Sequence, residues 1–202
     1  MTEVTMRERK KRATKSNILS AAIELIESNG FADTTMQAIA QKADVALRTL
    51  YNYFPTKESI VAKYIRTVVE DEAAKNWHEL MKLDSTFERL LFISCRSAEW
   101  SRTNLILTEV YASDPRNYFY GTSEDVPRSG LDEIVTAVLK MGQEMGDVSK
   151  VVPVEVLTRH FMGYFYVNIL TWLGDPNRDI AVLLREGLEI FYNGVSVGGR
   201  NG

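Results

Sequence analysis

The sequence is poor in the residues from which disulfides, metal centres and catalytic sites are commonly built. Its 202 residues include one cysteine, Cys95, and two histidines, His78 and His160, which stand far apart. A single cysteine excludes an internal disulfide and a thiolate zinc cluster, and it suits a reducing compartment such as the cytoplasm. The sequence also has no glycine-rich phosphate loop and no set of spaced metal ligands. We therefore expect no enzymatic activity, no metal and no cofactor.

A membrane-spanning segment is also missing from the sequence. The longest apolar stretch, residues 161–173, is interrupted by Asn168 and is shorter than the roughly 20 residues that a helix needs to cross a bilayer. The first sixteen residues are charged and lack the apolar core of a signal peptide. No stretch alternates with the period of two that marks strands, whereas apolar residues recur three or four apart. We therefore expect an all-α protein of the cytoplasm that does not contact a membrane.

Charge is distributed unevenly along the chain, although the formal net charge is only −3. Residues 1–57 hold nine lysines and arginines against six acids, which is a net charge of +3 and leaves −6 for residues 58–202. A basic run occupies residues 7–15. Such a run is typical either of a solvated arm or of a segment that contacts nucleic-acid phosphates. The asymmetry predicts a nucleic-acid-binding N-terminal part and a larger part without that role.

Residues 34–57, TTMQAIAQKADVALRTLYNYFPTK, predict two short helices joined by a turn. Thr34, as the N-cap of the first helix, is placed to form a capping box with Gln37. Asp44 stands at the turn, and Pro55 ends the second helix because proline cannot continue it. The apolar residues that hold the unit together are Met36, Ile39, Ala40, Ala43, Val45, Leu50 and Phe54. A short helix that is apolar behind and polar in front is typical of proteins that read the DNA major groove.

The polar side of the second helix is the predicted DNA-reading surface. Arg48 can donate two hydrogen bonds to guanine, and Asn52 can pair in the same way with adenine. The tyrosines can reach phosphates or thymine methyl groups, and the threonine and lysine side chains suit phosphates. For Tyr51 the alternative is partial burial, and for Arg48 it is a solvated side chain. The predicted DNA contacts are Thr35, Gln37, Arg48, Thr49, Tyr51, Asn52, Tyr53 and Lys57.

This stretch resembles the DNA-binding domain of the TetR family of bacterial transcriptional repressors. The resemblance rests on T-x-x-x-I-A from Thr35, T-L-Y-x-Y-F from Thr49, T-K-E from Thr56, and an upstream helix that ends in Asn-Gly-Phe. It covers roughly residues 12–65. The chain departs from the family pattern at Asp44, where glycine is usual, and at Ala46, where serine or threonine is usual. The second departure removes a side-chain cap, which costs about 1 kcal/mol in helix stability.

The resemblance implies two all-α domains. Residues 1–56 are expected to form a basic arm and a three-helix helix-turn-helix domain, and residues 57–202 a larger helical domain for effector binding and dimerisation. No proline or glycine lies between Pro55 and Leu83, so a long helix is expected to join the two domains. The predicted helices span about residues 11–29, 35–42, 46–53, 56–83, 85–98, 103–112, 131–145, 153–173 and 179–193, with a long loop over residues 113–130.

The last two predicted helices carry the expected dimer contact. Each has a small residue within an apolar stripe, and the resemblance implies a four-helix interface made of two helices from each subunit. Packing of these stripes within one subunit is the alternative. The predicted interface residues are Gly163, Ile180, Leu184, Gly187, Leu188 and Phe191.

An effector pocket is expected among the aromatic residues of the C-terminal domain. A few polar groups placed among aromatic side chains can orient a small molecule inside a helical bundle. The alternative is an aromatic core whose polar atoms are satisfied locally. The predicted ligand-binding residues are Trp100, Tyr111, His160, Phe161, Tyr164, Phe165, Asn168 and Trp172.

Together these features predict a ligand-responsive transcriptional repressor. The resemblance implies that it binds a palindromic operator of double-stranded DNA as a homodimer and is released by an unidentified small-molecule effector. A DNA-binding activator without small-molecule control and a helical protein-interaction module are the alternatives, and an enzyme is a third. A true DNA binder should lose affinity steeply with salt, whereas an interaction module should show no such DNA affinity.

Overall fold

The computed structural model describes residues 5–119 and 128–196, and these ranges contain α-helices joined by turns. One isolated bridge, between Val148 and Ser196, is the extended pairing found in this part of the chain. The all-α class predicted from the sequence is therefore confirmed. The helices are α1 (Met6–Asn29), α2 (Met36–Lys42), α3 (Leu47–Tyr53), α4 (Lys57–Met81), α5 (Thr86–Thr103), α6 (Leu105–Ala112), α7 (Arg116–Phe119), α8 (Leu131–Met145), α9 (Val154–Gly174) and α10 (Ile180–Val195).

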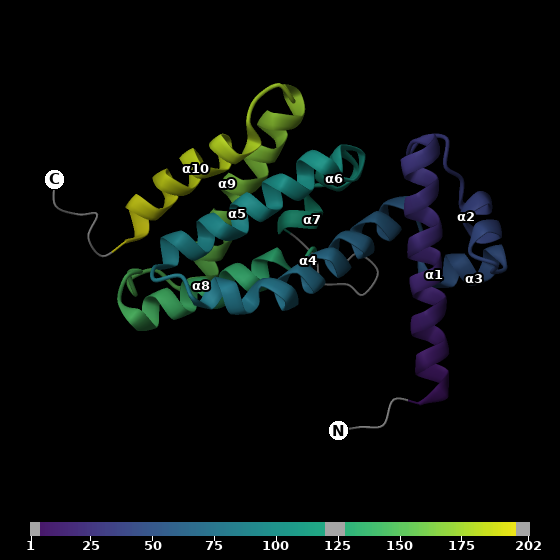
Figure 1. Ribbon diagram of the computed structural model, residues 1–202, viewed down its shortest axis with the longest axis horizontal. Helices are drawn as coiled ribbons and strands as arrows, with labels where there is room; N and C mark the ends of the chain where they lie inside the picture. The colour runs from purple at the N-terminus through teal and green to yellow at the C-terminus, as the bar shows by residue number, and fades with distance from the viewer. Residues whose placement is uncertain (1–4, 120–127, 197–202) are drawn as a thin grey trace.

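The helices form a small N-terminal unit and a larger bundle (Figure 1). Helices α1, α2 and α3 make up the small unit, whereas α5 to α10 pack together at the other end of the molecule. Helix α4 runs from the first group into the second. The loop predicted for residues 113–130 contains the short helix α7, and its residues 120–127 lie outside the described part of the chain.

The first helix is longer than predicted. It begins at Met6 and not near Lys11, and a capping box between Thr5 and Glu8 stabilises its start. The Thr5 hydroxyl accepts a hydrogen bond from the Glu8 backbone N–H, and the Glu8 carboxylate accepts one from the Thr5 backbone N–H at 2.8 Å. The hydrogen bonds that the Glu8 carboxylate accepts from the backbone N–H and the hydroxyl of Thr5 lower the pKa of Glu8. The basic run is consequently helical, and its side chains from residue 7 to residue 12 are exposed.

The helix-turn-helix forms as the apolar pattern predicts, with one difference at its first cap. Leu50 and Ile39 are fully buried in the core of the unit. Thr35, and not Thr34, caps α2, because the Thr34 hydroxyl instead donates to the carbonyl of Gly30 at 2.8 Å. The predicted capping box between Thr34 and Gln37 is therefore wrong.

The turn between α2 and α3 has the geometry that the sequence implied. Asp44 has a φ of +52°, in the left-handed region that glycine adopts more readily and that aspartate tolerates better than most residues. Ala46 occupies the N-cap of α3 and makes no side-chain hydrogen bond to it. The first turn of α3 therefore lacks a side-chain cap, as the departure from the family pattern predicted.

Helix α4 contributes to both hydrophobic cores. Ile60 packs in the core of the N-terminal unit, whereas Val61 and Ile65 pack in the core of the bundle. The bundle core also includes Ile23 and Ile26 from α1. The two cores therefore share α1 and α4, and the domain boundary between residues 56 and 57 stays a prediction.

Lys57, the first residue of α4, faces into the protein. Its ammonium group donates to the carbonyls of Phe31 and Thr34, each at 2.6 Å, and lies 4.5 Å from the centre of the Phe31 ring. The predicted contact between Lys57 and a DNA phosphate does not fit this geometry, because the ammonium group already binds these carbonyls and packs on this ring. Lys57 instead joins the start of α4 to the segment between α1 and α2.

Replacing Lys57 should therefore reduce stability. Lys57→Ala leaves two carbonyls without their charged donor, and we expect the free energy of unfolding in urea to fall by about 2 kcal/mol. Lys42→Ala is the control, because Lys42 forms an exposed ion pair with Glu24, and such a pair contributes about 1 kcal/mol or less. Equal losses in the two variants would contradict the structural role of Lys57.

Candidate DNA-reading face and effector cavity

The outer side of α3 exposes a cluster of polar side chains. Arg48 and Asn52 are exposed, and Tyr51 keeps 48% of its surface accessible, which argues against partial burial. Among the described residues Arg48 has no hydrogen-bond or ion-pair partner, so its guanidinium is free to donate. Gln37 on α2 and Thr35, the N-cap of α2, are exposed as well.

Two other predicted DNA contacts are less accessible. Thr49 is half-buried, and Tyr53 is half-buried with its ring packed against the core of the N-terminal unit. The basic start of α1 extends beyond α3 in the same unit (Figure 1). Lys15 connects this extension to the end of α3, because its ammonium lies 5.6 Å from the centre of the Phe54 ring.

The bundle encloses a cavity of about 330 Å³ between α4, α5, α6, α8 and α9. Its inner wall is apolar, and the polar atoms close to this wall are satisfied locally. The Tyr111 hydroxyl donates to the carbonyl of Asn117 at 2.9 Å and accepts from the backbone N–H of Ser129 at 2.8 Å. Burial raises the pKa of Tyr111 to about 12, so this hydroxyl stays protonated. The buried apolar residues of the wall are Ile65, Leu80, Ile93, Leu131, Phe165 and Ile169.

The cavity opens between α4 and α5. Four of its lining residues are exposed, namely Trp77 on α4 and Arg96, Glu99 and Thr103 on α5. Because the other lining residues are buried or half-buried, with no exposed one among them on α6, α8 or α9, the gap between these two helices is the mouth.

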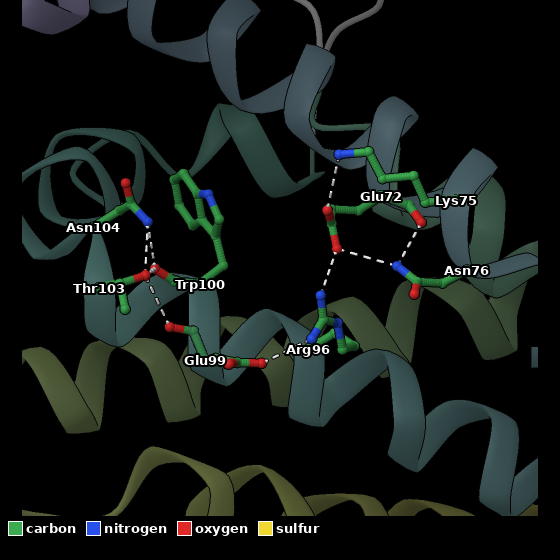
Figure 2. Close-up of polar contacts among 8 residues, drawn as sticks. All are labelled: Glu72, Lys75, Asn76, Arg96, Glu99, Trp100, Thr103 and Asn104. Atoms are coloured by element: carbon green, nitrogen blue, oxygen red, sulfur yellow. Dashed lines mark hydrogen bonds and ion pairs between the residues drawn. The ribbon is translucent and has the colours of Figure 1, made fainter. Parts of the chain in front are cut away.

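An ion-pair cluster stands at this mouth (Figure 2). The Arg96 guanidinium donates to Glu72 on α4 at 2.8 Å and to Glu99 on its own helix at 2.9 Å. Glu72 also accepts from the side-chain amide of Asn76 at 3.1 Å and lies 3.5 Å from the ammonium of Lys75. The hydrogen bond from Arg96 lowers the pKa of Glu72, and the one to Glu72 raises the pKa of Arg96. Both groups are therefore charged near neutral pH.

Three of the predicted ligand-binding residues, Trp100, Tyr111 and Phe165, line the cavity. The other five do not, because α9 directs them elsewhere. His160 is exposed, with its ring nitrogen 2.8 Å from the carbonyl of Val156. The four remaining residues pack within the bundle or form local hydrogen bonds, and they are Phe161, Tyr164, Asn168 and Trp172.

Sequence reasoning missed Arg96, Glu72 and Trp77 at the mouth. The available signal was weak: Arg96 and Glu99 place an ion pair three residues apart on a helix that also carries aromatic residues on this side. The partnership of Arg96 with Glu72 spans 24 residues and depends on how two helices pack. Periodicity within one helix does not reveal such a contact.

The predicted dimer interface needs correction. Ile180, Leu184 and Leu188 are buried within a single chain, so they cannot reach a second one. Gly187 lets α10 approach α9 closely, because a Cβ there would meet Tyr164 and Asn168 of the same chain.

Phe191 is half-buried, and its ring packs 5.8 Å from that of Phe161. A Cβ added at Gly163 would meet no atom within 4 Å. The large apolar residues that α9 and α10 do expose are Val167, Leu170, Val182 and Ile190.

The described residues contain no group of three or more histidine, cysteine, aspartate or glutamate side chains able to hold a metal ion. None of the helices described is long and apolar enough to cross a membrane.

The N-terminal unit matches a known sequence family. Residues 18–64 match the family described as "Bacterial regulatory proteins, tetR family". Among curated proteins, the chain is 22% identical to the fatty acid metabolism regulator protein of Bacillus subtilis over 190 residues, covering 93% of this chain and 98% of that protein. It is 32% identical to the transcriptional repressor KstR of Mycolicibacterium smegmatis over 103 residues, covering 51% and 48%. These relatives are named as regulators and not as enzymes.

Solved structures share the whole fold. The chain resembles Thermus thermophilus FadR, described as a TetR-family transcriptional repressor in complex with lauroyl-CoA, with a TM-score of 0.78 at 23% identity over 89% of this chain and 94% of that one. Bacillus subtilis FadR in complex with stearoyl-CoA gives a TM-score of 0.65 at 21% identity over 91% and 98%. At such identities the likeness establishes the fold, which combines a helix-turn-helix unit with a helical bundle.

The exposed guanidinium of Arg48 allows a direct test of the DNA-reading face. Arg48→Ala should cost roughly 1–3 kcal/mol of binding free energy for a selected DNA site and relax the preference at one base position. Lys82→Ala removes a positive charge from an exposed side chain of the bundle and should leave the site preference unchanged. The measurement is fluorescence anisotropy with sites that differ at single positions, and identical preferences of wild type and Arg48→Ala would contradict the role.

Proposed function

Because the chain belongs to the TetR family of bacterial regulatory proteins, we propose that it is a cytoplasmic transcriptional repressor controlled by a small molecule. It binds a palindromic operator as a homodimer, and it acts by binding and not by catalysis. The observation that carries this proposal is that one helix, α4, is separated from the exposed helix α3 by only three residues and ends in the wall of an apolar cavity. Occupation of the cavity can therefore act on the DNA-reading face.

The DNA contacts of the proposal follow from exposure. Arg48 and Asn52 read base edges, and Tyr51 contacts phosphate or a thymine methyl group. Tyr53 contributes only its hydroxyl, because its ring packs on the core. Lys57 is no longer among the contacts. The remaining contacts, which are made to the DNA backbone, are Thr35, Gln37 and Thr49.

The effector of the proposal carries an apolar chain. The cavity wall is lined mainly by aliphatic and aromatic side chains, and its volume lies near the lower end of the roughly 300–1,000 Å³ typical of ligand pockets. Two structural relatives are described in complex with lauroyl-CoA and stearoyl-CoA. Acyl compounds are therefore the first effectors to test on this protein.

Dimerisation is proposed because a single α3 reads too few base pairs to be selective. The exposed apolar residues of α9 and α10 form the face that we assign to the interface, together with the half-buried Gly163. This assignment replaces the buried residues of α10 that the sequence suggested.

The function is tested by selecting binding sites from random DNA with the purified protein. Enrichment of a palindrome, with an affinity that falls steeply as salt increases, supports a dimeric DNA-binding regulator. No enrichment at low salt would favour the helical protein-interaction module instead.

Effector binding should change the fluorescence of the tryptophans at the mouth. Trp77 and Trp100 line the cavity, whereas Trp172 does not, so titration with lauroyl-CoA or laurate should produce a saturable change in emission. Ile134→Trp, which places a larger side chain in the cavity wall, should weaken this binding at least about tenfold, the equivalent of 1.4 kcal/mol. Circular dichroism checks that the variant folds. Unchanged affinity in the folded variant would show that the ligand binds elsewhere.

The proposed dimer face can be tested with two substitutions at equally exposed positions. Ile190 and Val151 are both 79% exposed, but only Ile190 lies on the α9–α10 face. Ile190→Asp should shift the protein towards monomer in light scattering coupled to gel filtration, since a charge at an interface core is costly. Val151→Asp, between α8 and α9, should leave the mass unchanged. A dimer that survives Ile190→Asp would place the interface elsewhere.

A further inference from the structure

We propose that Arg96 is a masked anion-binding group that reads the head of the effector. In the free protein its guanidinium is occupied by Glu72 and Glu99, and the effector binds by taking the place of Glu72. The chemical class of the effector is then an apolar chain with an anionic head, either a carboxylate or a phosphate. This inference rests on the proposed function, because it concerns the same cavity.

The position of Arg96 supports this role. Arg96 is the single cation among the described residues that line the cavity, and it lies at the mouth, where the head of a ligand with its chain inside would sit. A guanidinium is planar and can donate two parallel hydrogen bonds to a carboxylate or phosphate. Here it already donates one hydrogen bond to each of two carboxylates. A ligand anion would therefore exchange one acceptor for another.

The exchange leaves no buried charge unpaired. Glu72, once displaced, keeps hydrogen-bond donors in Asn76 and Lys75 on its own helix. Glu99 keeps its ion pair with Arg96, and its side chain is 60% exposed to water. Because both partners retain solvent or a donor, the penalty for an unsatisfied buried charge does not oppose the exchange.

The two carboxylates differ in what they connect. Glu99 lies three residues after Arg96 on α5, so that ion pair is internal to one helix. Glu72 lies on α4, so its ion pair with Arg96 joins α4 to α5 across the mouth. A ligand that displaces Glu72 removes this connection, and α4 begins next to the DNA-reading helix. Effector binding and operator binding are thereby coupled through one ion pair.

The experiment uses the full-length protein and probes that share a twelve-carbon chain. The probes are laurate, lauroyl-CoA and, as a cationic comparison, dodecyltrimethylammonium below its micellar concentration. For each variant, probe affinity is measured by tryptophan fluorescence and operator affinity by anisotropy. The variants are Arg96→Met, Glu72→Gln, Glu99→Gln and, as a control on α4 away from the mouth, Glu79→Gln, whose wild-type partner is Lys82.

Arg96→Met should weaken the binding of the anionic probe roughly tenfold, as expected for the loss of a charged hydrogen bond. Glu72→Gln and Glu99→Gln should each strengthen it, since each removes a competitor for Arg96. Glu72→Gln should also weaken operator binding in the absence of ligand by about fivefold, within the usual range of coupling between sites. Glu99→Gln should have a smaller effect on the operator, and Glu79→Gln should match wild type in both assays.

The outcomes separate this inference from the proposed function. If laurate or lauroyl-CoA releases the operator from wild type and from Arg96→Met equally well, the inference fails while the proposed function stands. Equal operator affinities of Glu72→Gln and Glu99→Gln would overturn the coupling, and tighter binding of the cationic probe would overturn the anionic head. If no probe binds the wild type or affects its operator, the proposed acyl effector fails first. If Arg96→Met weakens the binding of laurate alone, the head of the effector is a carboxylate. If it weakens the binding of lauroyl-CoA alone, the head is a phosphate.

Discussion

The continuity of α4 is the constraint on which the rest of the structure depends. At 25 residues the helix is roughly 37 Å long, at 1.5 Å per residue. Ile60 anchors its first turn in the core of the N-terminal unit, and Val61 and Ile65 anchor the next turns in the bundle. Lys57 fastens its start to the segment after α1. A shift at one end is therefore transmitted along a stiff element, and a flexible linker in its place would separate the reading face from the cavity.

The cavity departs from what stability alone would favour. A bundle gains free energy when apolar side chains fill its interior, and unfilled space lowers stability. Here a space of about 330 Å³ remains beside an ion-pair cluster at its mouth, while the neighbouring core around Phe161 and Leu184 is closely packed. Local violations of good packing are expected where a protein binds something. The cavity and its mouth therefore have the character of a site and not of a packing defect.

The sequence predicted the fold well where structure is local. Three predictions depend only on residues within one turn of each other, and each was confirmed. They are the spacing of Leu50 and Phe54, the turn at Asp44 and the missing cap at Ala46. The predicted capping box at Thr34 failed for a local reason, because its hydroxyl donates to the carbonyl of Gly30 four residues earlier. The other wrong predictions depend on tertiary packing. Leu184 and Leu188 carry an apolar stripe, but the sequence does not say whether α5, α9 or a second chain covers it. Similarly, Arg96 and Glu72 meet only because two helices pack side by side.

The central claim is that the cavity and the DNA-reading face are coupled, and reciprocal linkage tests it most directly. The affinity of the effector is measured by calorimetry with free protein and with protein saturated by its selected operator. Coupling predicts weaker effector binding to the operator complex, by the same factor by which the effector weakens operator binding. Equal effector affinity in the two states, with the cavity occupied in both, would contradict the account.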